Sequence, residues 1–355
     1  MVVGRIVVAW SVPAFAFFTV ALLAIAVERT TTEAALEALR LRYLRRVTYL
    51  VGVAVLGVNA TVAGVLVPTS TNAVAGLAVL VALPTLWTLL AVRYATFSNR
   101  RRVRGLGVRF REVAARLTAE FGAFLGVATI LVGVFHVAPE GVVRVGALAG
   151  SAVLVAVSLP WWLSATLKTR APTAAEREPL ATLLGDNIEL VVVDDATRIG
   201  SAFAAGVVPG LRRVYVTRSL FDLLSERELA AVVAHEVGHL RRGHLLARTA
   251  LVVVGPLALL AAYDFGFAYA SPLAVVLIGP YVLGTLAAVR ATERDADAFA
   301  AERVGGEALA SALGTLVRAN LLLVQPRGPG RILSAHPPIA GRIRALRRGE
   351  SPPAD

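Results

Sequence analysis

Long apolar segments constrain the fold of this 355-residue chain more than any other feature of its sequence. Each runs for about 17 to 25 residues, the length that a helix needs to cross roughly 30 Å of hydrocarbon. Runs of this length with almost no charge indicate membrane-spanning helices, and not buried core helices. Seven spans are predicted, at residues 6–27, 47–67, 73–92, 119–138, 142–163, 249–267 and 272–289.

The composition agrees with a membrane protein, because 57% of the residues are hydrophobic and the mean hydropathy is +0.70. The first span lacks the basic start and the cleavage site of a signal peptide, so we expect it to remain as an anchor. The chain has no cysteine, which excludes disulfides and thiolate metal sites. Any metal must therefore be bound by histidine and carboxylate side chains.

Arginine alternates between the loops that join the predicted spans. Loops 28–46 and 93–118 are rich in arginine, whereas 68–72, 139–141 and 268–271 contain no basic residue. The positive-inside rule then places the N-terminus outside the cell membrane. The polar region between spans five and six and the C-terminal segment are expected in the cytoplasm. The same pattern accounts for the net charge of +12 without nucleic acid, which is not expected as a partner.

The polar region between spans five and six predicts a small mixed structure. Ile188–Val193 is rich in β-branched residues and predicts a strand. Ser201–Ala205 and Arg213–Thr217 predict two more strands, separated by a turn at Pro209 and Gly210.

A helix is predicted from Ser225 to about Leu246, because Ser225 and Glu228 form a capping box at its start. Within it, His235 and His239 are four residues apart, so both imidazoles share a face and can reach one metal ion. Glu236 follows the first histidine and is placed beside that metal, where a carboxylate can take a proton from water. Only 5 of the 355 residues are histidines, so this spacing seldom arises by chance. The pattern predicts a metal site.

Two histidines do not complete a catalytic zinc site, so a third protein ligand must lie downstream. Glu293 and Asp297 share a face of a helix that we expect to begin just after span seven. One of them can bind metal while the other orients a ligand histidine. His244 falls about 140° round the helix from His239, so it is expected to face solvent. The choice of ligand stays open among His244, Asp264, Glu293, Asp295, Asp297, Glu302 and His336.

These motifs resemble the HtpX and CAAX prenyl protease group of membrane metallopeptidases. In that group HExxH is followed by a transmembrane hairpin and then by ExxxD. The sequence has HEVGH at 235–239 and ERDAD at 293–297. Shorter matches are SAFA at 201–204 and SAHPP at 334–338. The resemblance covers about residues 185–348, whereas the first five spans match only in being hydrophobic.

The resemblance implies a role for each matching residue. His235, His239 and Glu293 are implied to be the ligands of a Zn²⁺ cofactor. Glu236 is implied to be the general base, and Asp297 to orient a ligand histidine from behind.

The resemblance also implies residues near the substrate. His336 and Arg342 are expected there, where donors stabilise the tetrahedral oxyanion. For Arg342 the alternative is that it belongs only to the basic C-terminal tail. The family usually has asparagine where Ser201 stands, on an edge strand that pairs with extended substrate. The residues expected to form this strand are Ser201, Ala202, Phe203 and Ala204.

The predicted fold class is a mostly α membrane protein with about seven transmembrane helices and a small α+β zincin-type domain on the cytoplasmic face. Residues 1–167 form a five-span region, and 168–248 form the first part of the catalytic domain. Residues 249–289 form a transmembrane hairpin, and 290–355 form the second part of that domain. Residues 307–324 are expected to be a helix packed on this domain, and not an eighth span.

The predicted function is zinc-dependent endopeptidase cleavage of membrane or membrane-associated proteins, as in HtpX-like quality control. The alternative is CAAX-type processing of a lipidated C-terminus. A seven-helix transporter or receptor is disfavoured, because the spans contain almost no ionisable residues. An inactive metal-binding scaffold is disfavoured by the intact Glu236. The expected partners are a polypeptide substrate and the lipid bilayer, and no oligomeric state is predicted.

Overall fold

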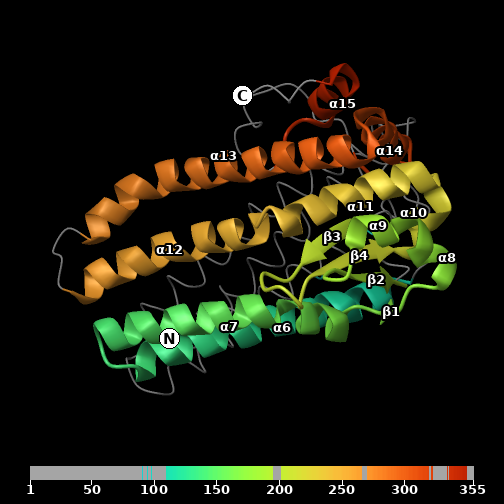
Figure 1. Cartoon of the computed structure of the whole chain (residues 1–355). Coiled ribbons are helices and arrows are strands. Elements are labelled where there is room, and N and C mark those ends of the chain that lie inside the picture. Colours follow the sequence, from blue (N-terminus) through green and yellow to red (C-terminus); the bar gives the residue numbers. More distant parts are fainter. Residues whose placement is uncertain are drawn as a thin grey trace. The chain divides into compact units, whose positions relative to one another are not determined.

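Figure 1 shows a computed structural model of the chain. The chain divides into two compact units, Met1–Leu125 and Gly126–Asp355, and the sheet and the candidate site lie in the second. The predicted spans at 6–27 and 47–67 and nearly all of 73–92 lie outside the described residues. The structure describes residues 109–194, 201–265, 270–319, 321–322, 334 and 336–349, together with Leu90, Tyr94 and Phe97.

Four long helices cover most or all of the other four predicted spans. They are α6 (Phe110–Val137), α7 (Val142–Thr166), α12 (His244–Asp264) and α13 (Ala270–Val304). Among the described helices, α7 alone is long and apolar enough to cross a membrane. The complete set of seven spans therefore stays a prediction.

The helix α13 corrects the prediction that a new helix begins after span seven. It continues without a break from the apolar segment through Glu293 and Asp297. Pro280 is accommodated inside it. One helix of 35 residues thus carries both the second half of the hairpin and the ERDAD motif, because nothing in its sequence after Pro280 interrupts the helical hydrogen bonding.

A four-stranded sheet follows α7. Its strands are β1 (Thr169–Arg170), β2 (Glu189–Val193), β3 (Ala202–Ala205) and β4 (Arg213–Thr217). The order is β1-β2-β4-β3, with β2 and β4 parallel and the other two pairs antiparallel. The three predicted strands are present, two of them starting one residue later than expected. The strand β1 was missed because two residues carry no periodic pattern.

Short helices connect the strands and lead into the helical layer. Between β1 and β2 lie α8 (Ala174–Arg177), η2 (Glu178–Leu180) and α9 (Ala181–Leu184). After β4 comes α10 (Arg218–Leu223). At the C-terminal side the structure has α14 (Gly306–Arg318) and α15 (Ile339–Arg348), so the helix predicted over 307–324 is shorter than expected.

The predicted capping box is present at the start of α11 (Glu226–Arg241), where Ser225 and Glu228 bond reciprocally. The helix ends five residues earlier than predicted. Its C-cap is Arg242, and Gly243 follows with φ 69°, a left-handed conformation that glycine adopts readily. The chain then turns and begins α12, so the prediction of one continuous helix to Leu246 is wrong.

The sheet has a buried core on each of its faces. On one face, Val214 and Val216 of β4 pack with Val233 and Val237 of α11, in a core that also includes α13 and α14. On the other face, Tyr215 packs with residues of β2 and with Leu167, which follows α7. The sheet therefore lies between α11 and the end of α7, and its edge strand β3 contacts α11.

Candidate metal centre

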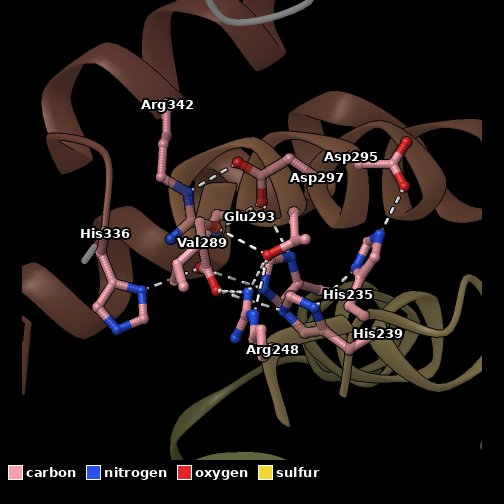
Figure 2. Close-up of polar contacts among 11 residues, drawn as sticks. His235, His239, Arg248, Val289, Glu293, Asp295, Asp297, His336 and Arg342 are labelled. Atoms are coloured by element: carbon pink, nitrogen blue, oxygen red, sulfur yellow. Dashed lines mark hydrogen bonds and ion pairs between the residues drawn. The ribbon is translucent and has the colours of Figure 1, made fainter. Parts of the chain in front are cut away.

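Two histidines on α11 form the base of the candidate site. His235 and His239 are four residues apart, and both are buried. Their rings meet edge to face, with centroids 4.8 Å apart. The Nε2 atoms of both rings face the same carboxylate, that of Glu293 on α13. The local helical spacing thus presents two imidazole nitrogens to one point (Figure 2).

Close packing of α11 against α13 brings Glu293 to these histidines. Gly238 lies between them on α11, and a Cβ added there would lie 3.2 Å from the Phe299 side chain and 3.3 Å from the Cα of Ala296. The glycine of HEVGH therefore lets the two helices approach more closely than a side chain would allow. Glu293 Oε1 lies 3.4 Å from His239 Nε2, and Oε2 lies 3.8 Å from His235 Nε2.

The donor set fits a zinc ion. One ligand atom from each of His235, His239 and Glu293 lies within 4.8 Å of the other two. Donors at about 2.0–2.2 Å from a tetrahedral zinc are roughly 3.3–3.6 Å apart, close to the 3.4 and 3.8 Å between the two imidazole nitrogens and the Glu293 oxygens that face them. Two imidazoles and one carboxylate leave a fourth position open for water or substrate. The structure therefore brings together the three residues that the resemblance implied as ligands.

Asp297 and Arg342 lie behind His235. Asp297 Oδ1 is 2.9 Å from His235 Nδ1, although the ring nitrogen is poorly aligned for a hydrogen bond. Arg342 on α15 donates from Nε and Nη2 to the two oxygens of Asp297, at 2.7 and 2.5 Å. Burial raises the pKa of Asp297, but the charge and hydrogen bonds of Arg342 together with the contact to His235 outweigh this effect and hold that pKa below its usual range. Arg342 is thus buried against Asp297.

His244 and Asp295 lie behind His239. The Nδ1 atoms of His239 and His244 are 3.0 Å apart, and His244 Nε2 is 2.8 Å from Asp295 Oδ2. Arg242 also pairs with Asp295, through Oδ1. His244 is buried, so the prediction that it faces solvent is wrong. The error follows from the early end of α11, because the turn at Gly243 redirects the residue that a continuous helix would have exposed.

Arg248 and His336 complete the surroundings of Glu293. Arg248 Nη2 donates to Glu293 Oε1 at 2.7 Å, and His336 Nδ1 lies 3.1 Å from Oε2 (Figure 2). Burial raises the pKa of Glu293, but the close contacts with His239 and His336 and the charges of His235 and His336 together outweigh this effect and leave the carboxyl strongly acidic. Arg248 was not among the residues predicted for the site. Its spacing of four from His244, on one face of α12, was the available signal.

Glu236 and His336 are the more accessible members of the cluster. Glu236 is half-buried, unlike the histidines that flank it in the motif. Burial lowers the pKa of His235, but Asp297 and, more weakly, the Glu236 carboxylate raise it above its ordinary value. The side chain of His336 is 61% exposed. Both residues therefore combine solvent access with proximity to the ligands.

The residues expected to contact substrate lie on β3, at the edge of the sheet. Ala202 and Ala204 pack toward the core that contains α11, whereas Phe203 stacks on Tyr215 with ring centroids 4.9 Å apart. Ser201 precedes the strand, and its backbone N–H and C=O bond to Thr217. Small side chains thus let the edge strand lie close to α11.

The sequence matches peptidase family M48 over residues 168–350. A protease HtpX homolog from Gemmatimonas aurantiaca is 33% identical, over 41% of this chain and 64% of the relative. A protease HtpX homolog from Kineococcus radiotolerans is 30% identical, over 64% of this chain and 93% of the relative. The chain thus spans less than two thirds of the first relative and nearly all of the second.

A solved structure resembles this chain in fold beyond residues 168–350, the region that matches the family. The crystal structure of S. mikatae Ste24p superposes with a TM-score of 0.65 over 96% of this chain and 98% of that chain. At 15% identity this likeness shows a shared fold. The expected resemblance to the HtpX and CAAX prenyl protease group is confirmed. The chain therefore belongs to peptidase family M48.

Proposed function

We propose that this chain is a membrane zinc endopeptidase that hydrolyses peptide bonds of membrane or membrane-associated proteins. The observation that carries the proposal is the convergence of His235, His239 and Glu293, with Glu236 beside them. Membership of a peptidase family supports it independently. A transporter would not need these groups, and an inactive scaffold would not need the carboxylate of Glu236.

Each residue of the site has a distinct proposed role in peptide-bond hydrolysis. Zinc, when bound, supplies a Lewis acid and makes water more acidic. Glu236 accepts the proton of the attacking water and later delivers it to the leaving amine. His336 is exposed beside Glu293, so it is placed to donate to the developing oxyanion.

For Arg342 the contacts favour a role other than oxyanion stabilisation. Its Nε and Nη2 are engaged with Asp297, and its side chain is 8% exposed. We therefore assign Arg342 to hold Asp297, which in turn orients His235. We assign stabilisation of the oxyanion to His336 and to Arg248. Arg248 pairs with Glu293, and its side chain is 23% exposed.

The backbone of β3 supports its proposed role as the substrate strand. Thr217 N donates to Ser201 O, so alternate residues from Ser201 onward direct their backbone groups toward β4. Ala202 and Ala204 then direct theirs away from β4, toward the open edge. An extended substrate can add there as a further strand, beside the motif helix.

Exposed apolar side chains support placement in a bilayer. They occur along the three helices that contain predicted spans in the second unit, where water would disfavour them. Trp161 and Trp162 are exposed near the end of α7, as expected at a membrane interface. With the arginine pattern, these features favour a multi-pass cell-membrane protein whose site faces the cytoplasm. Examples are Val153 and Leu154 on α7, Val252 and Val254 on α12, and Val276 and Leu277 on α13.

Zinc quantification combined with a casein-type cleavage assay tests the proposal. Purified wild type should hold one zinc per chain and cleave the substrate. Glu236→Gln should keep the zinc, because Glu236 is not a ligand, and should lose activity by about a hundredfold to ten-thousandfold. Glu226→Gln, an exposed change in the first turn of the same helix, is the matched control and should retain activity. A Glu236→Gln variant with more than about a tenth of wild-type activity would refute this mechanism.

CAAX-type processing is the second candidate, and the fold shared with Ste24p along almost the whole chain is the observation that favours considering it. We favour quality control, because prenylated substrates are not found in every organism. The same preparation can be offered a farnesylated peptide ending in a CAAX sequence and a misfolded membrane protein. Selective release of the last three residues of the peptide would reverse the preference.

A further inference from the structure

A chain of contacts runs from His239 away from the metal side of its ring. His239 Nδ1 meets His244 Nδ1 at 3.0 Å, and His244 Nε2 meets Asp295 Oδ2 at 2.8 Å. His239 and His244 are buried, and their rings lie with centroids 5.2 Å apart. This arrangement differs from that of His235, whose Nδ1 faces the Asp297 carboxylate directly.

The positions of protons in this chain follow from the geometry. Nε2 of His239 faces Glu293 and must offer a lone pair to bind metal, so the neutral ring carries its proton on Nδ1. That N–H donates to His244 Nδ1, which must then be an acceptor. His244 consequently carries its own proton on Nε2, from which it donates to Asp295. Each contact has one donor and one acceptor.

We propose that His244 and Asp295 are positioning residues, which form a relay that fixes the tautomer and orientation of His239 for metal binding. The inference rests on the proposed metal site. A carboxylate hydrogen-bonded to the far side of a ligand imidazole makes it a better donor to the metal. Here Asp295 acts on His239 through one intervening imidazole, that of His244, which contacts both residues.

The relay also connects three helices. His239 lies near the end of α11, His244 is the first residue of α12, and Asp295 lies on α13. Arg242 pairs with the second oxygen of Asp295 and so holds the carboxylate in place. The relay therefore links the start of α12 and Asp295 on α13 to His239, the second proposed metal ligand.

Zinc affinity, measured on the full chain in detergent by competition with a chelator, tests the relay. His244→Phe keeps a ring of similar size but removes both nitrogens, and should weaken zinc binding by about 10- to 100-fold. His244→Asn places an amide oxygen near the position of Nδ1 and should recover part of that loss. If His244 served only in packing, His244→Phe would bind zinc at least as tightly as His244→Asn.

Asp295→Asn gives a second test that does not depend on a buried substitution, since the side chain is 37% exposed. It should weaken zinc binding in the wild-type background and have little further effect in His244→Phe, because residues that act in series are not additive. Asp222→Asn, at an exposed position on α10, should leave affinity unchanged in both. If His244→Phe does not fold, the zinc affinity of Asp295→Asn in the wild-type background is the test of the relay.

The outcomes separate the relay from the function on which it rests. Wild type that binds no zinc would overturn the proposed function. Wild type that binds one zinc, with unchanged affinity in His244→Phe or in Asp295→Asn, would overturn the relay alone. Equal loss in Asn and Phe at position 244 would also overturn it, because the restored acceptor would then have no effect.

Discussion

Arg342→Ala distinguishes a positioning role from an oxyanion role. Arg342 and Asp297 form a bidentate pair whose side chains are 8% and 0% exposed. Removing the guanidinium leaves the carboxylate buried without its partner, which typically costs about 3–5 kcal/mol. Arg342→Ala should therefore destabilise the metal-free protein and weaken zinc binding, because Asp297 no longer orients His235. A residue that contacts only the oxyanion would change turnover and neither of these quantities.

The assay is thermal unfolding of the detergent-solubilised protein in the presence of a chelator. One kcal/mol corresponds to roughly 2–4 °C for a unit of this size, so the unfolding temperature should fall by about 6–20 °C. Arg344→Ala is the matched control, since Arg344 lies on the same helix, is exposed, and bonds to the backbone of Ala340. It should change the unfolding temperature by little.

A double variant checks the physical cause. Adding Asp297→Asn to Arg342→Ala removes the unpaired buried charge, so part of the lost stability should return. Zinc affinity should not return, because the amide is a poorer partner for His235. Wild-type stability and zinc affinity in Arg342→Ala, with reduced turnover, would show that the guanidinium acts on the substrate, and our reasoning would be wrong.

Three further changes test other parts of the structure. Gly238→Val should push α13 away and weaken zinc binding in the same chelator competition, whereas Gly341→Val, where a Cβ meets open space, should not. The hydrogen bond from Arg170 lowers the pKa of Glu176 to about 2 from 4.5. The resulting stabilisation is present above pH 4.5 and lost as the pH falls toward 2, and a Glu176→Gln variant unfolded at several pH values should lack this dependence. Ala204→Pro should remove an outward N–H of β3 and raise KM in the cleavage assay with zinc content unchanged, and an unaltered KM would count against substrate pairing at this edge.

Features that depend on local spacing could be predicted from the sequence. The capping box at Ser225 and the common face of His235 and His239 follow from helical geometry within a few residues, and the structure has both. The strand Arg213–Thr217 has the predicted bounds because its alternation and flanking turn are also local signals. Glu293 was one of several candidates until the resemblance selected it.

What the sequence could not determine depends on contacts between distant segments. His244 is buried, and not exposed as predicted, because α11 ends before Gly243. The two-residue turn there cannot be deduced from the periodicity of the sequence. The partner of Arg342 was set by the packing of α15 against α13, across 45 residues of sequence. The spacing of side chains along a helix is therefore set by its regular, locally hydrogen-bonded backbone, whereas the contacts behind the metal ligands are decided by which helices pack together in the folded chain.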